Sequence, residues 1–178
     1  MSVSNILGEF VGRIRSSETR LAEAESKEWV GPTRGCRVYR NANQSIPNAA
    51  FTPIAFTTEI FDKGGCWSVA QPTRLVAPRD GYYVAEANVS LDNAGDTDGQ
   101  RALTIRSSAG DYLGMVSRIA AAAAEGHMNF QVHTGLIYLV AADWVTIELY
   151  QNSGAAKNVL AASIQEQCNC HASLVRMH

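Results

Sequence analysis

The sequence is poor in charge. Only 18% of its 178 residues are charged, against about 25% in an average globular protein. The 15 basic and 17 acidic side chains nearly cancel and leave a formal net charge of −2, so the chain lacks the basic surplus that binds nucleic acid. Hydrophobic residues make up 46%, which is enough for a real core. Burial against partner subunits would explain so little charge, and a surface rich in Ser, Asn and Gly would look the same.

Long apolar runs are also absent. No stretch approaches the roughly 18 apolar residues that span a bilayer. The most hydrophobic segment, from Gly135 to Val145, is interrupted by Asp143. The first 20 residues lack the basic opening, apolar run and cleavage site of a secretory signal. We therefore expect no membrane insertion, and synthesis and assembly in a cytoplasm.

The four cysteines are too few for a scaffold built on disulfides. They are Cys36, Cys66, Cys168 and Cys170. Their pairing cannot be read from the sequence. If Cys36 lies on a first strand and Cys168 or Cys170 near a last one, the two strands would bring them together. The alternative is a set of reduced thiols in a half-buried sheet, where free cysteine behaves as a small hydrophobe.

Sequence motifs for catalysis are missing. There is no phosphate-binding loop, no dinucleotide fingerprint, no zinc-protease helix motif and no nucleophile elbow. The one compact ligand cluster runs from Cys168 to His171, but on a strand Cys170 and His171 would point to opposite faces, which suits a single zinc ion poorly. We predict no enzyme, no cofactor and no bound metal.

Residues Asn5 to Glu28 are predicted to form a helix, which Ser4 or Asn5 would cap and Gly31-Pro32 would end. Its apolar residues recur at spacings of three and four, the pattern of a narrow seam. The predicted docking or trimerisation residues are Leu7, Phe10, Val11, Ile14 and Leu21. Three heptads are marginal for an isolated coiled coil, so the helix needs a trimer, a docking surface or its own domain to pack on. We expect residues 1–34 to be this helix and its linker, and residues 35–178 to be one domain.

From Gly35 onward the pattern changes to short strands separated by turn residues. Tyr82 to Leu91 alternates, as does Trp144 to Tyr150. Further strands are predicted around Leu103 and Ile105, at Leu113–Ile119, over Val132–Val140 with both faces buried, and at Ser173–His178. Ala120–Ala124 is interpreted as a strand end or connection, and Ala155–Gln167 as a strand or a loop. Many short strands without a helix favour an all-β sandwich or barrel.

Several segments resemble the superfamily of complement globular heads and tumour necrosis factors. They are Phe61-Asp62, Leu75–Tyr83 with its Pro-x-x-Gly-type turn and Tyr-rich strand, Leu139–Ile147 and the turn Tyr150–Gly154. Together they span Arg37 to His178 in the expected order. The resemblance implies a jelly-roll sandwich that trimerises through aromatic and aliphatic side chains and carries partner-binding loops at one end.

Two features depart from that family. The usual glycine before the aspartate is Ala142, so its turn must avoid a positive φ or be strained to reach it. The collagen-like Gly-X-Y stalk of many animal members is absent. A trimeric jelly roll on a short helical leader is instead similar to accessory proteins of tailed bacteriophages. That likeness predicts a non-enzymatic homotrimer in the virion, a head decoration or fibre, whose N-terminal segment binds capsid or tail proteins.

The alternative function is a receptor- or carbohydrate-binding module at a fibre tip, which could recognise a host-surface glycan. Its predicted ligand-facing residues are Trp67, in a glycine-rich segment, and Asp92, Asp96 and Asp98 in one acidic loop. The Asp92–Gly99 loop lacks the ligand pattern of a calcium hand, and a polar turn explains its composition equally well. Exposed aromatic residues in the outer loops would favour a binder, and apolar surface at the base would favour a structural protein.

Overall fold

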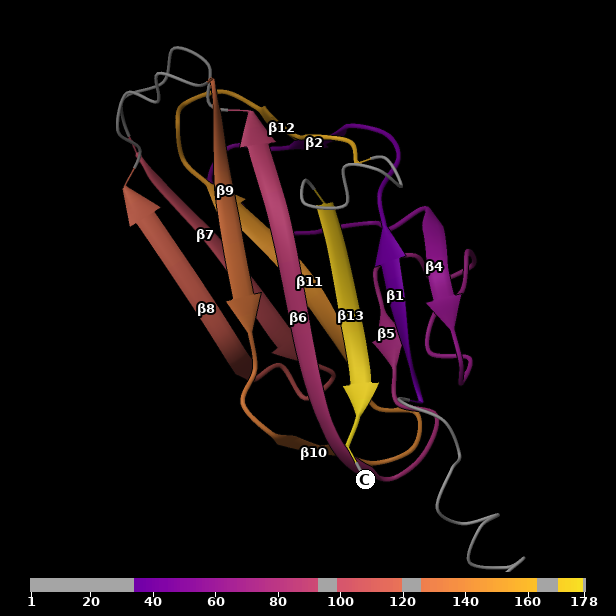
Figure 1. The fold of residues 1–178 in the computed structure, drawn as a ribbon. Helices are drawn as coiled ribbons and strands as arrows, with labels where there is room; N and C mark the ends of the chain where they lie inside the picture. Colours follow the sequence, from indigo (N-terminus) through magenta and orange to yellow (C-terminus); the bar gives the residue numbers. More distant parts are fainter. Residues whose placement is uncertain (1–33, 93–98, 120–125, 163–169, 178) are drawn as a thin grey trace, which may run out of the picture. The chain divides into compact units, whose positions relative to one another are not determined.

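The computed structural model describes residues 34–92, 99–119, 126–162 and 170–177, which all belong to one compact unit, Thr33–His178 (Figure 1). These residues contain strands and connections and no helix. Among them, accordingly, no helix is long and apolar enough to cross a membrane. The predicted docking helix lies outside the described residues, so the division at residue 34 stays a prediction.

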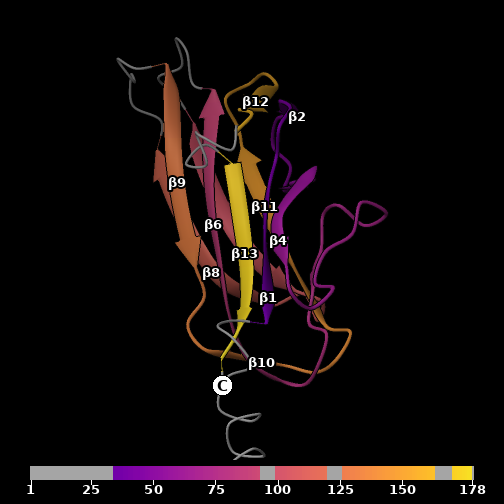
Figure 2. The same ribbon diagram turned by 45° about the vertical axis from the view of Figure 1, so that its right-hand side comes forward.

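In the described residues, thirteen strands form two sheets that pack face to face (Figure 2). The large sheet has the order β2-β12-β6-β13-β1-β4, and β9 and β10 also pair with β6. The small sheet has the order β3-β11-β7-β8, with β5 also paired to β11. The strands are β1 Gly35–Tyr39, β2 Gln44–Ile46, β3 Thr52–Pro53, β4 Thr58–Asp62, β5 Leu75–Val76, β6 Gly81–Asp92, β7 Gln100–Ser107, β8 Tyr112–Ile119, β9 His127–His133, β10 Ile137–Leu139, β11 Trp144–Gln151, β12 Lys157–Val159 and β13 Cys170–Arg176.

The predicted alternation of the long strands is confirmed. The five inward residues of β6 are all buried, as are three of β11 and two of β7. They are Tyr83, Ala85, Ala87, Val89 and Leu91, then Val145, Ile147 and Leu149, then Leu103 and Ile105. Since successive side chains of a strand point to opposite faces, these residues form one core between the sheets. The result is an all-β jelly-roll sandwich, as the sequence predicted.

One predicted segment is corrected. Val132–Val140 is not a single strand with both faces buried, because β9 ends at His133 and β10 begins at Ile137. Between them Thr134 binds back to β6: its amide donates to the carbonyl of Ala85 (2.8 Å) and its hydroxyl accepts from the Ala85 amide (3.0 Å). The chain therefore changes direction, and Tyr138 on β10 is exposed. The last strand also begins earlier than predicted, at Cys170, and ends at Arg176.

The turn before β11 has a positive φ at Ala142, the position where the family that the sequence resembles usually has glycine. Ala142 has a φ of 72°, in the left-handed region that L-residues avoid. Two carboxylates hold the turn in this shape. Asp143 accepts from the amide of Val140 (3.0 Å), and Asp80 accepts from the amide of Ala141 (2.7 Å). Ala142 itself donates to the carbonyl of Ala77 (2.9 Å), so surrounding hydrogen bonds outweigh the local strain.

The cysteine geometry also differs from one expectation. Cys36 on β1 is opposite Leu174 of β13, four residues from Cys170, so antiparallel register keeps Cys36 and Cys170 apart. Cys36 instead lies beside Cys66, in the loop after β4. The pKa of Cys36 is raised, mainly by a hydrogen bond between the two side chains and next by burial. Cys36, Cys66 and Cys170 are buried free thiols, which confirms the reduced alternative for these three. Cys168 lies outside the described residues.

Candidate functional site on the outer face of the large sheet

The outer face of the large sheet, the side turned away from the small sheet, carries a polar band. Register places Arg37, Ser173, Glu86 and His133 in one row across β1, β13, β6 and β9. The next row holds Tyr39, His171, Asn88 and Gln131. These positions alternate with the buried core positions of the same strands, so the sequence pattern that builds the core also puts polar groups outside.

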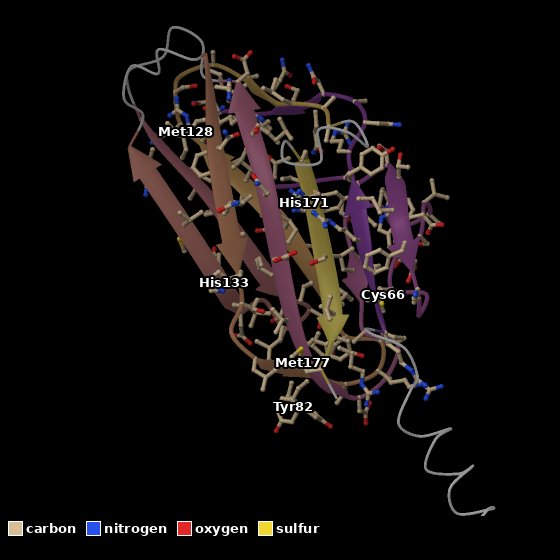
Figure 3. The ribbon with its side chains drawn as sticks, viewed as in Figure 1. Cys66, Tyr82, Met128, His133, His171 and Met177 are labelled. Carbon is tan, nitrogen blue, oxygen red and sulfur yellow. The ribbon has the colours of Figure 1, made fainter. Side chains whose placement is uncertain are left out.

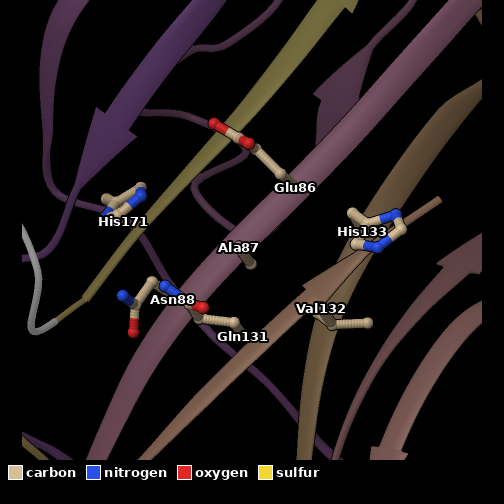
Figure 4. Close-up of a pocket in the computed structure, with 7 residues that line it drawn as sticks. All are labelled: Glu86, Ala87, Asn88, Gln131, Val132, His133 and His171. Carbon is tan, nitrogen blue, oxygen red and sulfur yellow. The ribbon is translucent and has the colours of Figure 1, made fainter.

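A shallow groove of about 180 Å³ lies within this band (Figure 4). Its lining comes from β6, β9 and β13, namely Glu86, Ala87, Asn88, Gln131, Val132, His133 and His171. In the close-up Glu86 and His171 lie on one side of Ala87 and His133 on the other. Glu86 accepts a hydrogen bond from the Ser173 hydroxyl (3.1 Å), and Nδ1 of His133 is 3.1 Å from the carbonyl oxygen of Thr134.

One polar atom at the groove is not satisfied by the described chain. The side-chain oxygen of Asn88 is buried and has no hydrogen-bond partner there. Buried acceptors in native proteins almost always have a partner, from protein or water. A hydrogen-bond donor from solvent or from a second chain in the groove would give the Asn88 oxygen a partner.

Below the polar band, the same sheet ends in an exposed apolar cluster, here called the base patch. It consists of Tyr82, Leu136, Tyr138, Val140 and Met177. Figure 3 shows Tyr82 and Met177 together at the lower end of the sandwich. Tyr82 and Tyr138 are cross-strand partners whose rings meet edge to face at 5.3 Å, and the Met177 amide donates to the Tyr82 carbonyl (2.8 Å). Exposed apolar side chains at one end of a polar face are typical of a contact surface.

The titratable side chains of the described residues form no metal-binding cluster. No group of three or more His, Cys, Asp or Glu side chains among them could hold a metal ion. Burial raises the pKa of Cys170 to about 12 and lowers that of the Arg40 guanidinium, neither of which activates a nucleophile or base. Cys170 is buried, whereas His171 lies on the outer face, as the alternation of a strand predicted. The arrangement can bury surface against a partner.

The structure brings few of the predicted site residues to this face. The indole of Trp67 is half-buried against the core, and its Nε1 donates to the Pro72 carbonyl (3.4 Å), so it is not an open stacking platform. Asp92 is half-buried at the end of β6, while Asp96 and Asp98 lie outside the described residues. The docking residues Leu7, Phe10, Val11, Ile14 and Leu21 lie outside them too.

The base patch was missed by sequence reasoning, although a signal for it existed. Leu136, Tyr138 and Val140 were correctly placed on one face, but that face was assigned to the interior. Tyr82 looked like an ordinary outward residue of a two-tyrosine strand. What the sequence could not show is that β10 pairs with the start of β6 and gathers these side chains at one end.

Comparison with known structures places this architecture in a known class, the jelly roll of the tumour necrosis factor type. Eiger TNF from S. frugiperda matches with a TM-score of 0.54 and 11% identity over 83% of this chain and 94% of its own. Murine APRIL, solved at pH 5.0, matches with a TM-score of 0.58 and 13% identity over 82% of this chain and 99% of its own. No protein-family model and no curated protein sequence matches the chain. At such low identity the likeness shows the fold.

Proposed function

We propose that this protein is a non-enzymatic homotrimer whose subunits meet through the outer face of the large sheet. The base patch carries the proposal. Two tyrosines, a methionine and two aliphatic residues lie together beside a polar band, which is the composition of an interface core with its rim. The tumour necrosis factor fold of the neighbours supports, by analogy, an oligomer of three subunits.

The groove is a second, separate reason to propose a subunit interface on this face. A subunit that covers it would bring a donor to the unpartnered oxygen of Asn88 and exclude water from the row containing Glu86 and His133. The rest of the band offers hydroxyl, amide and imidazole groups that can pair across an interface. A polar centre of this kind favours one register of the subunits over others, since a shifted register would leave buried groups unpaired.

The test is the mass of the purified full-length chain in solution, measured by light scattering over a range of concentrations. We expect three times the 19.2 kDa of one chain. A monomer at every concentration would reject the trimer, and a stable dimer would reject the threefold arrangement.

The finer proposal is that this trimer is an accessory protein of a bacteriophage virion, a head decoration or fibre assembled in the host cytoplasm. Its support is the sequence: an amphipathic N-terminal segment with Leu7, Phe10, Val11, Ile14 and Leu21 that precedes a jelly-roll head. Capsid or tail proteins are the proposed partners of that segment. The double substitution Phe10→Asp/Ile14→Asp should abolish attachment to purified particles while the mass of the head stays unchanged. Normal attachment of this variant would contradict the anchor.

A second candidate function, adhesion to a glycan, is favoured by an aromatic cluster on the small sheet. The Phe51 ring lies 5.0 Å from Tyr150 and 6.1 Å from Tyr112, and Phe51 and Tyr112 are exposed. Exposed rings of this kind stack on sugar faces, and three copies would add avidity to weak single sites. If adhesion is the function, Tyr112→Ala should lose binding to a glycan array that Val69→Ala, at another exposed apolar residue, keeps. Equal binding by both variants, or none by the native chain, would reject it.

A further inference from the structure

A second pocket, of about 140 Å³, lies at the lower end of the sandwich and is lined almost entirely by cations. We call it the basic pocket. Its residues are Arg34, Lys63, Gly64, Pro78, Arg79 and Arg176. Figure 3 shows nitrogen-bearing side chains gathered at this end, near the start of β1 and the end of β13. Four positive groups around so small a volume contrast with a chain whose overall net charge is −2.

The strand pairing forces these cations together. The amide of Arg176 at the end of β13 donates to the carbonyl of Arg34 just before β1 (2.9 Å), and the amide of Lys63 donates to the carbonyl of Gly35 (2.9 Å). The fourth cation, Arg79, stands in the turn that leads into β6, where its carbonyl accepts a hydrogen bond from the buried Tyr83 hydroxyl (2.7 Å). The backbone therefore holds all four side chains at one site against their mutual repulsion.

The neighbouring carboxylates form hydrogen bonds with backbone amides and no ion pair with these cations. Asp62 accepts from the amides of Cys66 (2.9 Å) and Trp67 (3.0 Å), and Asp80 accepts from the amide of Ala141 (2.7 Å). Neither carboxylate lines the pocket. Within the described parts of the chain, no ion pair joins any of the four cations to an acidic side chain; the pair found there is Arg106 with Glu148.

Arg176 is one of several arginines whose buried Nε has no acceptor in the described chain. Its guanidinium donates through Nη2 to the carbonyl of Asp80 (2.9 Å), while its Nε is buried without an acceptor. A Cβ at Gly81 would come within 2.5 Å of this Nε, so glycine at that position leaves the room in which the guanidinium lies. An anion in the pocket would offer acceptors to the guanidinium of Arg176, which lines it.

We propose that the basic pocket binds a tetrahedral oxyanion, a phosphate or sulfate group. The forked donors of two half-buried arginines suit the oxygens of such a group, and the exposed Lys63 and Arg79 add positive charge at the mouth. The volume admits one such group and not a polymer backbone. All four cations come from one chain, so the site does not depend on the number of subunits.

The test is calorimetric titration of the full-length chain with inorganic phosphate, inorganic sulfate, glucose 6-phosphate and glucose, at constant ionic strength in chloride. We expect binding of phosphate and sulfate and none of glucose. Tighter binding of glucose 6-phosphate than of phosphate would identify an esterified group as the natural ligand, and equal binding would identify the free ion. No heat with any of the anions above the chloride background would overturn the proposal.

The double substitution Lys63→Gln/Arg79→Gln isolates the site, because both side chains are exposed and the fold uses their backbone groups. It should weaken phosphate binding at least about tenfold, as expected for losing two charged contacts. The matched control is Lys157→Gln on β12, which also removes a positive charge and should stay within about twofold of the native chain. Native-like binding by the double variant, or an equal loss in the control, would overturn the assignment. Circular dichroism of each variant checks the fold.

Discussion

The two outer faces of the sandwich are built differently. On the small sheet, outward residues of β7 and β11 are buried within their own chain, among them Ala102, Thr104 and Glu148. The Thr104 hydroxyl donates to the Gly114 carbonyl, Glu148 pairs with Arg106, and the Phe51, Tyr112 and Tyr150 rings form a cluster on this side. The large sheet also buries outward residues, Tyr39, Ser90 and Ser173 among them, but it leaves others open. Its polar groove is open, and aromatic residues at its base face solvent.

The difference teaches which face needs a partner. The small sheet covers its small outward side chains, although Arg106 Nε is buried there without an acceptor and Tyr112 and Met115 are exposed. The large sheet differs in the apolar residues exposed at its base, and these are the ground for proposing that a second chain covers it. The proposed subunit contact on the large sheet therefore rests on the base patch and not on the solved neighbours.

The largest effect on oligomeric mass should come from introducing a carboxylate on the outer face of the large sheet, compared with the same change on the small sheet. Tyr138→Asp places a carboxylate in the base patch, and we expect the oligomer to dissociate to monomers, because a buried unpaired charge is costly at an interface. Tyr112→Asp makes the same change on the small sheet at a residue of similar exposure, 52% against 58%, and should leave the mass unchanged. Light scattering measures the oligomeric mass of both variants. If both dissociate, or neither does, the two faces do not differ in the proposed way.

The second prediction concerns the inner face of the large sheet, where burial of Cys170 should make stability depend on pH. The folded pKa of Cys170 is about 12, raised by burial from 9.0, so the folded chain keeps a proton that the unfolded chain loses. Its contribution to stability is fully present below about pH 9 and is lost as pH rises towards 12. The slope in that window should be about 1.4 kcal/mol per pH unit. Urea denaturation at fixed protein concentration should find this slope reduced in Cys170→Ala; an unchanged slope would show that Cys170 is not shielded from water.

Removing the Phe51 ring should affect the small sheet alone. Phe51→Ala exposes the positions beneath it and should destabilise the chain by about 1–2 kcal/mol, less than a fully buried ring because Phe51 is 39% exposed. The oligomeric mass should not change. Thermal unfolding together with light scattering measures both quantities. A change in mass would mean that the aromatic cluster also contacts a subunit.

The smallest effect concerns the turn before β11. Ala142→Gly should stabilise the protein by about 0.5–1 kcal/mol, because relief of the left-handed strain exceeds the added entropy of the unfolded glycine. Ala141→Gly, one residue earlier in the same turn and without a positive φ, should destabilise it by a similar amount. Denaturant titration of both variants provides the comparison. Destabilisation by Ala142→Gly would mean that the turn is not strained.

The parts of this account that the sequence predicted are those governed by local periodicity. Alternation in β6 and β11 correctly placed Val89 and Ile147 in the core, the strand pattern predicted a sandwich or barrel, and the family resemblance implied the jelly roll. What required the structure depends on pairing between distant segments. The base patch needs β10 beside β6, the basic pocket needs Arg34 beside Arg176, and the neighbour of Cys36 is Cys66 because of a loop path that no pattern encodes.

The most direct test of the central claim is hydroxyl-radical footprinting of the native full-length protein, read at three tyrosines. In a single chain Tyr82, Tyr138 and Tyr112 are almost equally exposed, at 54%, 58% and 52%. We predict that Tyr82 and Tyr138 are strongly protected by the neighbouring subunits, while Tyr112 on the small sheet is modified at the rate its exposure implies. Equal modification of all three would contradict the claim that subunits meet on the large sheet.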